Sequence, residues 1–172
     1  EDNNTGSKHI AERGREEDMA GLGATDLCDA EGCLDELLVR HLRQELLPTD
    51  ADAGRDKVYV LHMIGSHGPA YFKRYPKEFE RFTPTCDTGE LRKCSREEIV
   101  NAYDNALLYT DHILARTIAF LKERQARFDT ALLYVSDHGE SLGENGLYLH
   151  GVPYAIAPDE QTLREHAMRG NF

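Results

Sequence analysis

The residues of this sequence best suited to bind a metal ion are an adjacent acid and imidazole, Asp137 and His138. A carboxylate and an imidazole suit zinc or manganese, and the pair would supply two ligands of a tetrahedral set. Side chains of adjacent residues point to opposite faces of a strand. Gly139 permits the chain to break there, so that both side chains can converge on one ion. The alternative is that Asp137 caps a turn and His138 is a hydrogen-bonded loop residue.

Two more histidines, His67 and His150, carry rings that exchange protons near neutral pH and could serve as acid or base. His67 follows an apolar run at 57–64, as the Asp-His pair follows a second run at 130–135. Because ligands of open α/β sheets bind outside the carboxyl ends of the strands, we expect these groups at one rim. His150 lies in a glycine-rich segment that begins at Glu140; a surface histidine is the alternative explanation for it.

The elements expected to position these side chains are two strands joined by a long helix. The runs at 57–64 (KVYVLHMI) and 130–135 (TALLYV) are nearly continuous in apolar residues, which favours strands buried on both faces. Between them, 95–98 (SREE) matches a capping box, and apolar residues at helical spacing predict a helix of about 27 residues through Lys122. This order predicts a right-handed parallel crossover in an α/β sheet. Leucines at helical spacing predict a shorter helix over 35–47.

The composition argues against nucleic-acid binding. Acidic residues number 31 against 20 basic ones, and the formal net charge is −11, so a basic footprint is absent. No stretch approaches the roughly 20 apolar residues that span a bilayer, and no signal peptide is visible. Because the first residue is Glu rather than Met, we expect a fragment or a processed product.

Four cysteines form two closely spaced pairs, Cys28 with Cys33 and Cys86 with Cys94. None has the C-x2-C spacing of a zinc knuckle, so a cysteine-based metal site is not expected. The short separations within polar segments favour two local disulfides, with four buried thiols as the alternative. Disulfides would indicate an oxidising compartment, the periplasm or the exterior.

Three segments make the sequence recognisable: SDHGESLGENGLYLHG at 136–151, GPAYFKRY at 68–75 and NAYDNALL at 101–108. Together they resemble the bacterial lipid A phosphoethanolamine transferases, a family that includes the plasmid-borne colistin-resistance enzymes. The likeness runs from Asp2 to about Gln161, whereas the SDHG element alone is shared with sulfatases and the wider alkaline phosphatase superfamily. The resemblance implies a partial alkaline-phosphatase-like α/β sandwich with a mostly parallel central sheet flanked by helices.

The resemblance also implies roles for the histidines and acids of the site. Asp137 and His138 would be zinc ligands. His67 and His150 would be catalytic residues that line the substrate side or hold a second zinc ion. Glu140, just past the zinc pair, would lie close enough to contact substrate or support the ligands.

Further implications concern the beginning of the chain and the cysteines. Asn4 and Lys8 resemble the family's Asn/Lys segment and would contact phosphoethanolamine. Cys86 and Cys94 match a family disulfide closely, and Cys28 with Cys33 matches another that has a longer loop.

The implied activity is transfer of phosphoethanolamine from phosphatidylethanolamine to a lipid A phosphate, which gives polymyxin and colistin resistance. The resemblance places such a protein in the bacterial inner membrane, with residues 1–172 in the periplasmic catalytic domain. The family's membrane domain, a zinc-binding Glu and the nucleophilic Thr lie upstream of residue 1, and the tail at 162–172 departs from the family. We therefore expect no transferase activity from the 172 residues alone.

Two alternatives remain at this point. A zinc phosphodiesterase or sulfatase-like hydrolase would share the Asp-His pair but release its product to water. A sulfatase would also need a Cys or Ser in a C/S-x-P-x-R setting, which this sequence lacks. The other alternative is a degenerate fragment that catalyses nothing.

Overall fold

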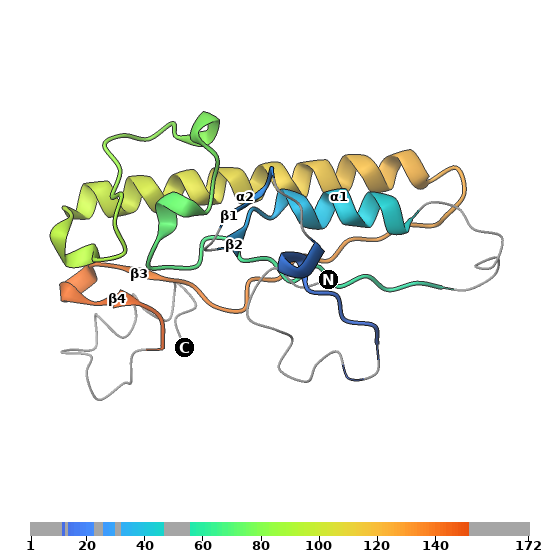
Figure 1. Cartoon of the computed structure of the whole chain (residues 1–172), viewed down its shortest axis with the longest axis horizontal. Helices are drawn as coiled ribbons and strands as arrows, with labels where there is room; N and C mark the ends of the chain where they lie inside the picture. Colours follow the sequence, from blue (N-terminus) through green and yellow to red (C-terminus); the bar gives the residue numbers. More distant parts are fainter. Residues whose placement is uncertain (1–11, 13, 23–25, 30–31, 47–55, 152–172) are drawn as a thin grey trace. The chain divides into compact units, whose positions relative to one another are not determined.

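The computed structural model describes residues 12, 14–22, 26–29, 32–46 and 56–151 (Figure 1). Asn4, Lys8 and the tail at 162–172 therefore lie outside the described residues. The chain divides into two compact units, 1–65 with 110–130 and 66–109 with 131–172. Each unit is described by itself.

The first unit is built on the amphipathic helix α1 (Glu36–Glu45), which confirms the short helix predicted over 35–47. Before it come the 3-10 helix η1 (Met19–Leu22) and the antiparallel strands β1 (Cys28–Asp29) and β2 (Gly32–Cys33). The Cys28–Cys33 disulfide joins the two strands, as predicted. Buried residues of α1 and η1 form the core of this unit: Met19, Leu37 and Leu38.

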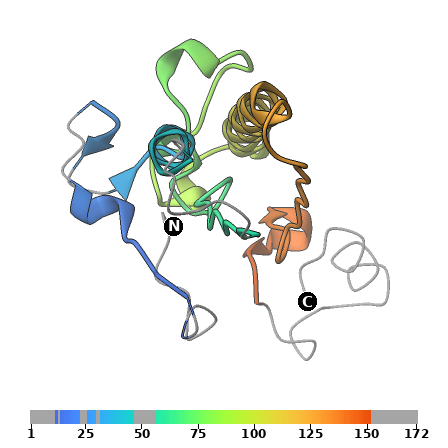
Figure 2. The same cartoon turned by 90° about the vertical axis from the view of Figure 1, so that its right-hand side faces the viewer.

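Helix α1 lies alongside the second half of helix α2 (Arg96–Arg124), as Figures 1 and 2 show, and charged pairs join the two helices. Arg116 lies 2.5 Å from Glu36, and Arg43 lies 3.5 Å from Glu123 and over the ring of Phe120. Glu36 at the start of α1 pairs with Arg116, and Arg43 near its end pairs with Glu123 further along α2, so the two helices run in the same direction.

The second unit contains the first part of α2, three 3-10 helices and a two-stranded antiparallel sheet. The 3-10 helices are η3 (Tyr71–Lys73), η4 (Lys77–Phe79) and η5 (Leu91–Lys93). Strand β3 (Ser141–Leu142) pairs with β4 (Tyr148–Leu149), and η6 (Glu144–Gly146) lies between them. The core residues are Tyr71, Cys86, Leu91, Ile99, Ala102 and Leu142.

The long helix begins as the sequence predicts. The carboxylate of Glu98 accepts hydrogen bonds from the backbone N–H and the hydroxyl of Ser95, at 2.7 and 2.8 Å, and Ser95 Oγ accepts one from the N–H of Glu98 at 3.2 Å. This capping box satisfies backbone groups that a helix start leaves unpaired. The predicted Cys86–Cys94 disulfide precedes it, and the N–H of Cys86 donates to the carbonyl of Glu98. The loop at 86–95 is thereby fastened to the helix.

The predicted parallel sheet is not found among the described residues, although helices and strands are mixed there as expected. The runs at 57–64 and 130–135 contain no strand, and Val58 and Leu133 are 89% and 88% exposed. A strand exists only through pairing with a neighbour, and an apolar run of this kind suits a strand with partners on both sides. Among the described residues neither run pairs with a neighbouring strand of a sheet; the first run contributes a single bridge residue, His62.

The end of the first run is nevertheless fixed in place. The carboxylate of Asp35, which is buried at the start of α1, accepts hydrogen bonds from the N–H groups of Ile64 and Gly65 at 2.9 and 2.8 Å. Two charge-assisted bonds hold the chain at the point just before the segment that carries His67.

Candidate metal centre

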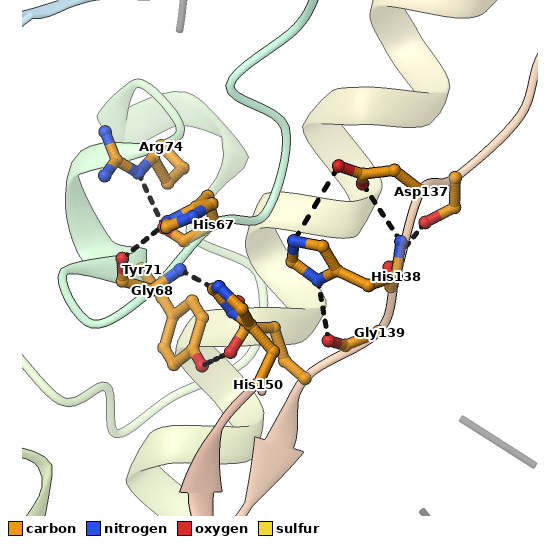
Figure 3. Close-up of polar contacts among 10 residues, drawn as sticks. His67, Gly68, Tyr71, Arg74, Asp137, His138, Gly139 and His150 are labelled. Carbon is orange, nitrogen blue, oxygen red and sulfur yellow. Dashed lines mark hydrogen bonds and ion pairs between the residues drawn. The ribbon is translucent and has the colours of Figure 1, made fainter. Parts of the chain in front are cut away.

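Three histidines from separate segments of the second unit converge: His67, His138 and His150 (Figure 3). The rings of His138 and His150 stack with centroids 4.0 Å apart. The ring of His67 stands edge-on to both, at 4.9 Å from His150 and 6.0 Å from His138. One ring nitrogen of each lies within 4.8 Å of the others, and all three residues are half-buried. The structure thus brings together three of the four residues that the sequence analysis placed at the metal or beside it.

The fourth, Asp137, is exposed and leans toward the ring of its neighbour. Its Oδ2 lies 3.8 Å from Nε2 of His138, and its Oδ1 accepts the N–H of His138 at 3.0 Å. Ligands of a tetrahedral zinc with bonds of about 2.0–2.1 Å lie about 3.3 Å apart. The two atoms lie further apart than that, and Asp137 does not join the three histidines whose ligand atoms all lie within 4.8 Å of one another.

Hydrogen bonds determine which nitrogen each ring presents. Nδ1 of His67 donates to the carbonyl of Gly68 at 2.8 Å, and Nδ1 of His138 donates to the carbonyl of Gly139 at 2.9 Å (Figure 3). Nδ1 of His150 donates to a carboxylate at 2.9 Å. A carbonyl or carboxylate oxygen only accepts, so the proton sits on Nδ1 and the lone pair of each neutral ring is on Nε2. Histidines that bind metals in proteins are held in this way.

The carboxylate that holds His150 belongs to Glu140, which is buried. Its Oε1 accepts from Nδ1 of His150 and, at 3.4 Å, from the N–H of Gly68; its Oε2 accepts from the hydroxyl of Tyr71 at 3.1 Å. Both oxygens are therefore engaged by protein groups. The sequence analysis expected Glu140 to contact substrate or to support the ligands, and in the structure its carboxylate is hydrogen-bonded to the ring of His150.

Tyr71 completes this buried network. Burial raises the pKa of its hydroxyl above the ordinary value of 10.0, and the charge of Glu140 acts in the same direction. The hydroxyl thus stays protonated and donates to the carboxylate. A Cβ added to Gly68 would lie 2.8 Å from this hydroxyl oxygen and 2.6 Å from Leu149, so only glycine fits between them.

The β3–β4 hairpin delivers His150 to the centre. Glu144 holds its turn: Oε2 accepts the N–H of Leu142 at 2.7 Å, and Oε1 accepts from Arg96 at 3.1 Å. Leu149, just before His150, has a φ of 66°, which is uncommon for a residue with a side chain. Such a conformation persists only where the surroundings impose it.

The sequence analysis missed the supporting roles of Tyr71, Arg74 and Glu144. Arg74 donates from Nε to the carbonyl of His67 at 2.8 Å (Figure 3). The available signal was the aromatic and basic content of 68–75, directly after His67, but residue types alone did not show which groups would turn back toward it.

Comparisons with known proteins bear on the identity of this centre. The soluble domain of lipooligosaccharide phosphoethanolamine transferase A from Neisseria meningitidis matches with a TM-score of 0.79 at 39% identity, covering 96% of this chain and 52% of that one. Phosphoethanolamine transferase EptA of Escherichia coli (strain K12) is 50% identical over 160 residues, 93% of this chain and 28% of the relative. Phosphatidylethanolamine transferase Mcr-2 of Escherichia coli is 59% identical over 111 residues, 64% of this chain and 21% of the relative.

The chain thus spans about a quarter of the length of the curated relatives it matches. Their names confirm the resemblance to phosphoethanolamine transferases. A family model described as Sulfatase matches residues 2–170, nearly the whole chain. The chain therefore belongs to the sulfatase family.

Proposed function

We propose that this chain carries the metal-binding and acid–base part of a zinc-dependent transferase that moves phosphoethanolamine from phosphatidylethanolamine to a lipid A phosphate. The observation that carries the proposal is the common orientation of His67, His138 and His150, each donating from Nδ1 to a protein oxygen. The names of the relatives support the group, its donor and a lipooligosaccharide acceptor.

The donor set of the centre fits zinc. Imidazole nitrogens and a carboxylate oxygen are its usual protein ligands. Asp137 and His138 hold the ion in this proposal, and His67 and His150 line the substrate side or hold a second ion. A bound zinc ion supplies positive charge that polarises a phosphoryl oxygen and makes a nearby hydroxyl easier to deprotonate.

The chain's own residues supply proton transfer and orientation. Neutral His67 and His150, with their protons on Nδ1, each present an Nε2 lone pair that takes a proton from the attacking group and returns it to the leaving oxygen. Glu140 acts through His150, because its hydrogen bond keeps the ring in the required tautomer. Asn4 and Lys8, outside the described residues, are proposed to contact the phosphoethanolamine group.

The proposed place of action is the bacterial inner membrane, with the metal centre facing the periplasm. Both disulfides, Cys28–Cys33 and Cys86–Cys94, support an oxidising compartment. Among the described residues, no helix has the length and apolar character to cross a bilayer. Association with the membrane is therefore proposed to depend on the lipid substrates and on a membrane domain that the resemblance places upstream.

The test is a lipid product assay on the intact protein that contains this chain, expressed in bacterial membranes. We expect phosphoethanolamine on lipid A phosphates, and a loss of about 10²–10⁴ in rate for His150→Ala, the range of an acid–base group. His112→Ala, a histidine of α2 outside the centre, is the matched control and keeps full activity. Release of phosphoethanolamine to water with unmodified lipid A would overturn the proposal in favour of a phosphodiesterase or sulfatase-like hydrolase.

A second arm of the assay uses the 172-residue chain alone. The resemblance implies a nucleophilic threonine that no residue of this chain matches, so we expect no transfer product from it. A modified lipid A made by the chain alone would show that a residue within it acts as the nucleophile.

A further inference from the structure

A second cluster of metal-binding side chains lies in the first unit, formed by Glu17, His41 and Glu45. One ligand atom of each lies within 4.8 Å of the others. His41 and Glu45 are four residues apart on α1, so both side chains lie on one face of the helix. Glu17 comes from the segment before η1, and its Oε2 is hydrogen-bonded to Nε2 of His41.

The three side chains are partly withdrawn from water. Their exposed fractions are 18% for Glu17, 12% for His41 and 35% for Glu45. The hydrogen bond from His41 is the main cause that lowers the pKa of Glu17, and Arg15 acts in the same direction. The cluster thus places two carboxylates and one imidazole close together, an arrangement that a nearby cation stabilises.

Arg15 now supplies that cation. Its guanidinium is paired with Glu17 and lies 3.6 Å from Glu45. The Arg15 side chain is 73% exposed, and an ion pair of an exposed arginine contributes little stability. A divalent ion that carries twice the charge can displace it, and the arginine can turn outward into water.

Two further features of this place favour a cation. Glu45 is the last residue of α1, where the helix dipole disfavours a carboxylate and favours a positive charge. An open pocket of about 170 Å³ adjoins the cluster, and its volume exceeds the roughly 10–15 Å³ needed to hold one water. An ion and its remaining water ligands therefore have room. The lining residues are Arg15, Glu17, Glu45, Val58, Tyr59 and Val60.

We propose that Glu17, His41 and Glu45 form a divalent-cation site for zinc, separate from the histidine centre. Two carboxylates and one imidazole supply three of zinc's usual ligands, and water completes the set. Nε2 of His41, which now donates to Glu17, binds the ion once its proton has moved to Nδ1, the tautomer that metal binding requires. The site shares no residue with the histidine centre, so its test is independent of the proposed transferase activity.

The test is a Zn²⁺ titration of the full 172-residue chain, followed by ¹⁵N NMR of the histidine rings. We expect the His41 signals, assigned by their loss in His41→Ala, to shift on zinc addition in the parent chain and equally in His138→Ala. Unchanged His41 signals at millimolar zinc would overturn the proposal and leave the cluster as an ionic contact between two segments.

Bound zinc, measured by mass spectrometry after dialysis, gives a second readout. His41→Ala and the conservative Glu45→Gln are each expected to weaken zinc at this site at least tenfold, whereas His112→Ala leaves it unchanged. Arg15→Ala is expected to tighten binding about two- to fivefold, the equivalent of one exposed ion pair. Equal zinc content in the parent, His41→Ala and Glu45→Gln would contradict the site, and weaker binding in Arg15→Ala would contradict the role given to the arginine.

Discussion

The carboxylate of Glu140 accepts a hydrogen bond from Nδ1 of His150 at 2.9 Å, across the ten residues that contain the β3–β4 hairpin. The same carboxylate accepts from Tyr71 and from the N–H of Gly68, the residue after His67. One buried group therefore joins the segments that carry His67 and His150. The positions of these two histidines therefore depend on the Glu140 carboxylate, and both of its oxygens accept hydrogen bonds from protein groups.

Replacing Glu140 tests this dependence. Glu140→Ala leaves the donors of His150, Gly68 and Tyr71 without this acceptor, so we expect a loss of about 1–3 kcal/mol in the free energy of unfolding. Glu140→Gln keeps one acceptor oxygen, and the Tyr71 hydroxyl can turn to accept from its amide, so the expected loss is about 0.5–1.5 kcal/mol. Urea unfolding measures both. Equal losses would show that the negative charge, rather than the acceptors, stabilises the network.

The close approach at Gly68 gives a prediction with a matched control. A Cβ there would lie 2.6 Å from Leu149 and 2.8 Å from the Tyr71 hydroxyl, so Gly68→Ala must displace both side chains. We expect a loss of about 1–3 kcal/mol, the usual cost of overpacking. Gly21→Ala meets nothing within 4 Å and serves as the control. Thermal unfolding of both variants decides, and a Gly68→Ala chain as stable as Gly21→Ala would contradict the packing.

The pKa of Tyr71 makes stability depend on alkaline pH. Burial, and then the charge of Glu140, raises this pKa above 10.0, the value expected in the unfolded chain. The unfolded chain therefore loses this proton first, so the stabilising contribution is complete below pH 10 and is lost as the pH rises beyond it toward the folded pKa. Tyr71→Phe removes the group, so its unfolding free energy should fall less steeply between pH 9 and 11. Parallel curves for parent and variant would show that Tyr71 ionises normally when folded.

The local features of the fold were predictable because their causes are local. The capping box between Ser95 and Glu98, the long helix behind it and both disulfides depend on residues close in sequence, and the structure contains them all. The sheet pairing expected at 57–64 and 130–135 has no local cause. A strand there needs neighbouring strands, and the apolar pattern alone does not show whether they are present. Val58 and Leu133 are accordingly exposed rather than buried.

The candidate site shows the same division. Asp137 and His138 were indicated by their adjacency and by the glycine that follows them. The apolar run before His67 indicated that this histidine lies close to the pair. The orientation of the rings could not be predicted, since it depends on carbonyl partners and on Glu140 bonding across the hairpin. The positive φ of Leu149 likewise arises from tertiary packing and has no signal in the residue type.

The most direct test of the histidine centre is the local structure around zinc bound to it. X-ray absorption at the zinc edge of the His41→Ala chain isolates this centre, because His41 belongs to the other proposed site. The account predicts nitrogen and oxygen ligands at about 2.0–2.1 Å with outer scattering from imidazole rings, and loss of that signal in the His138→Ala, His41→Ala double variant. A zinc ion without imidazole scattering, or an unchanged signal after removal of His138, would contradict it.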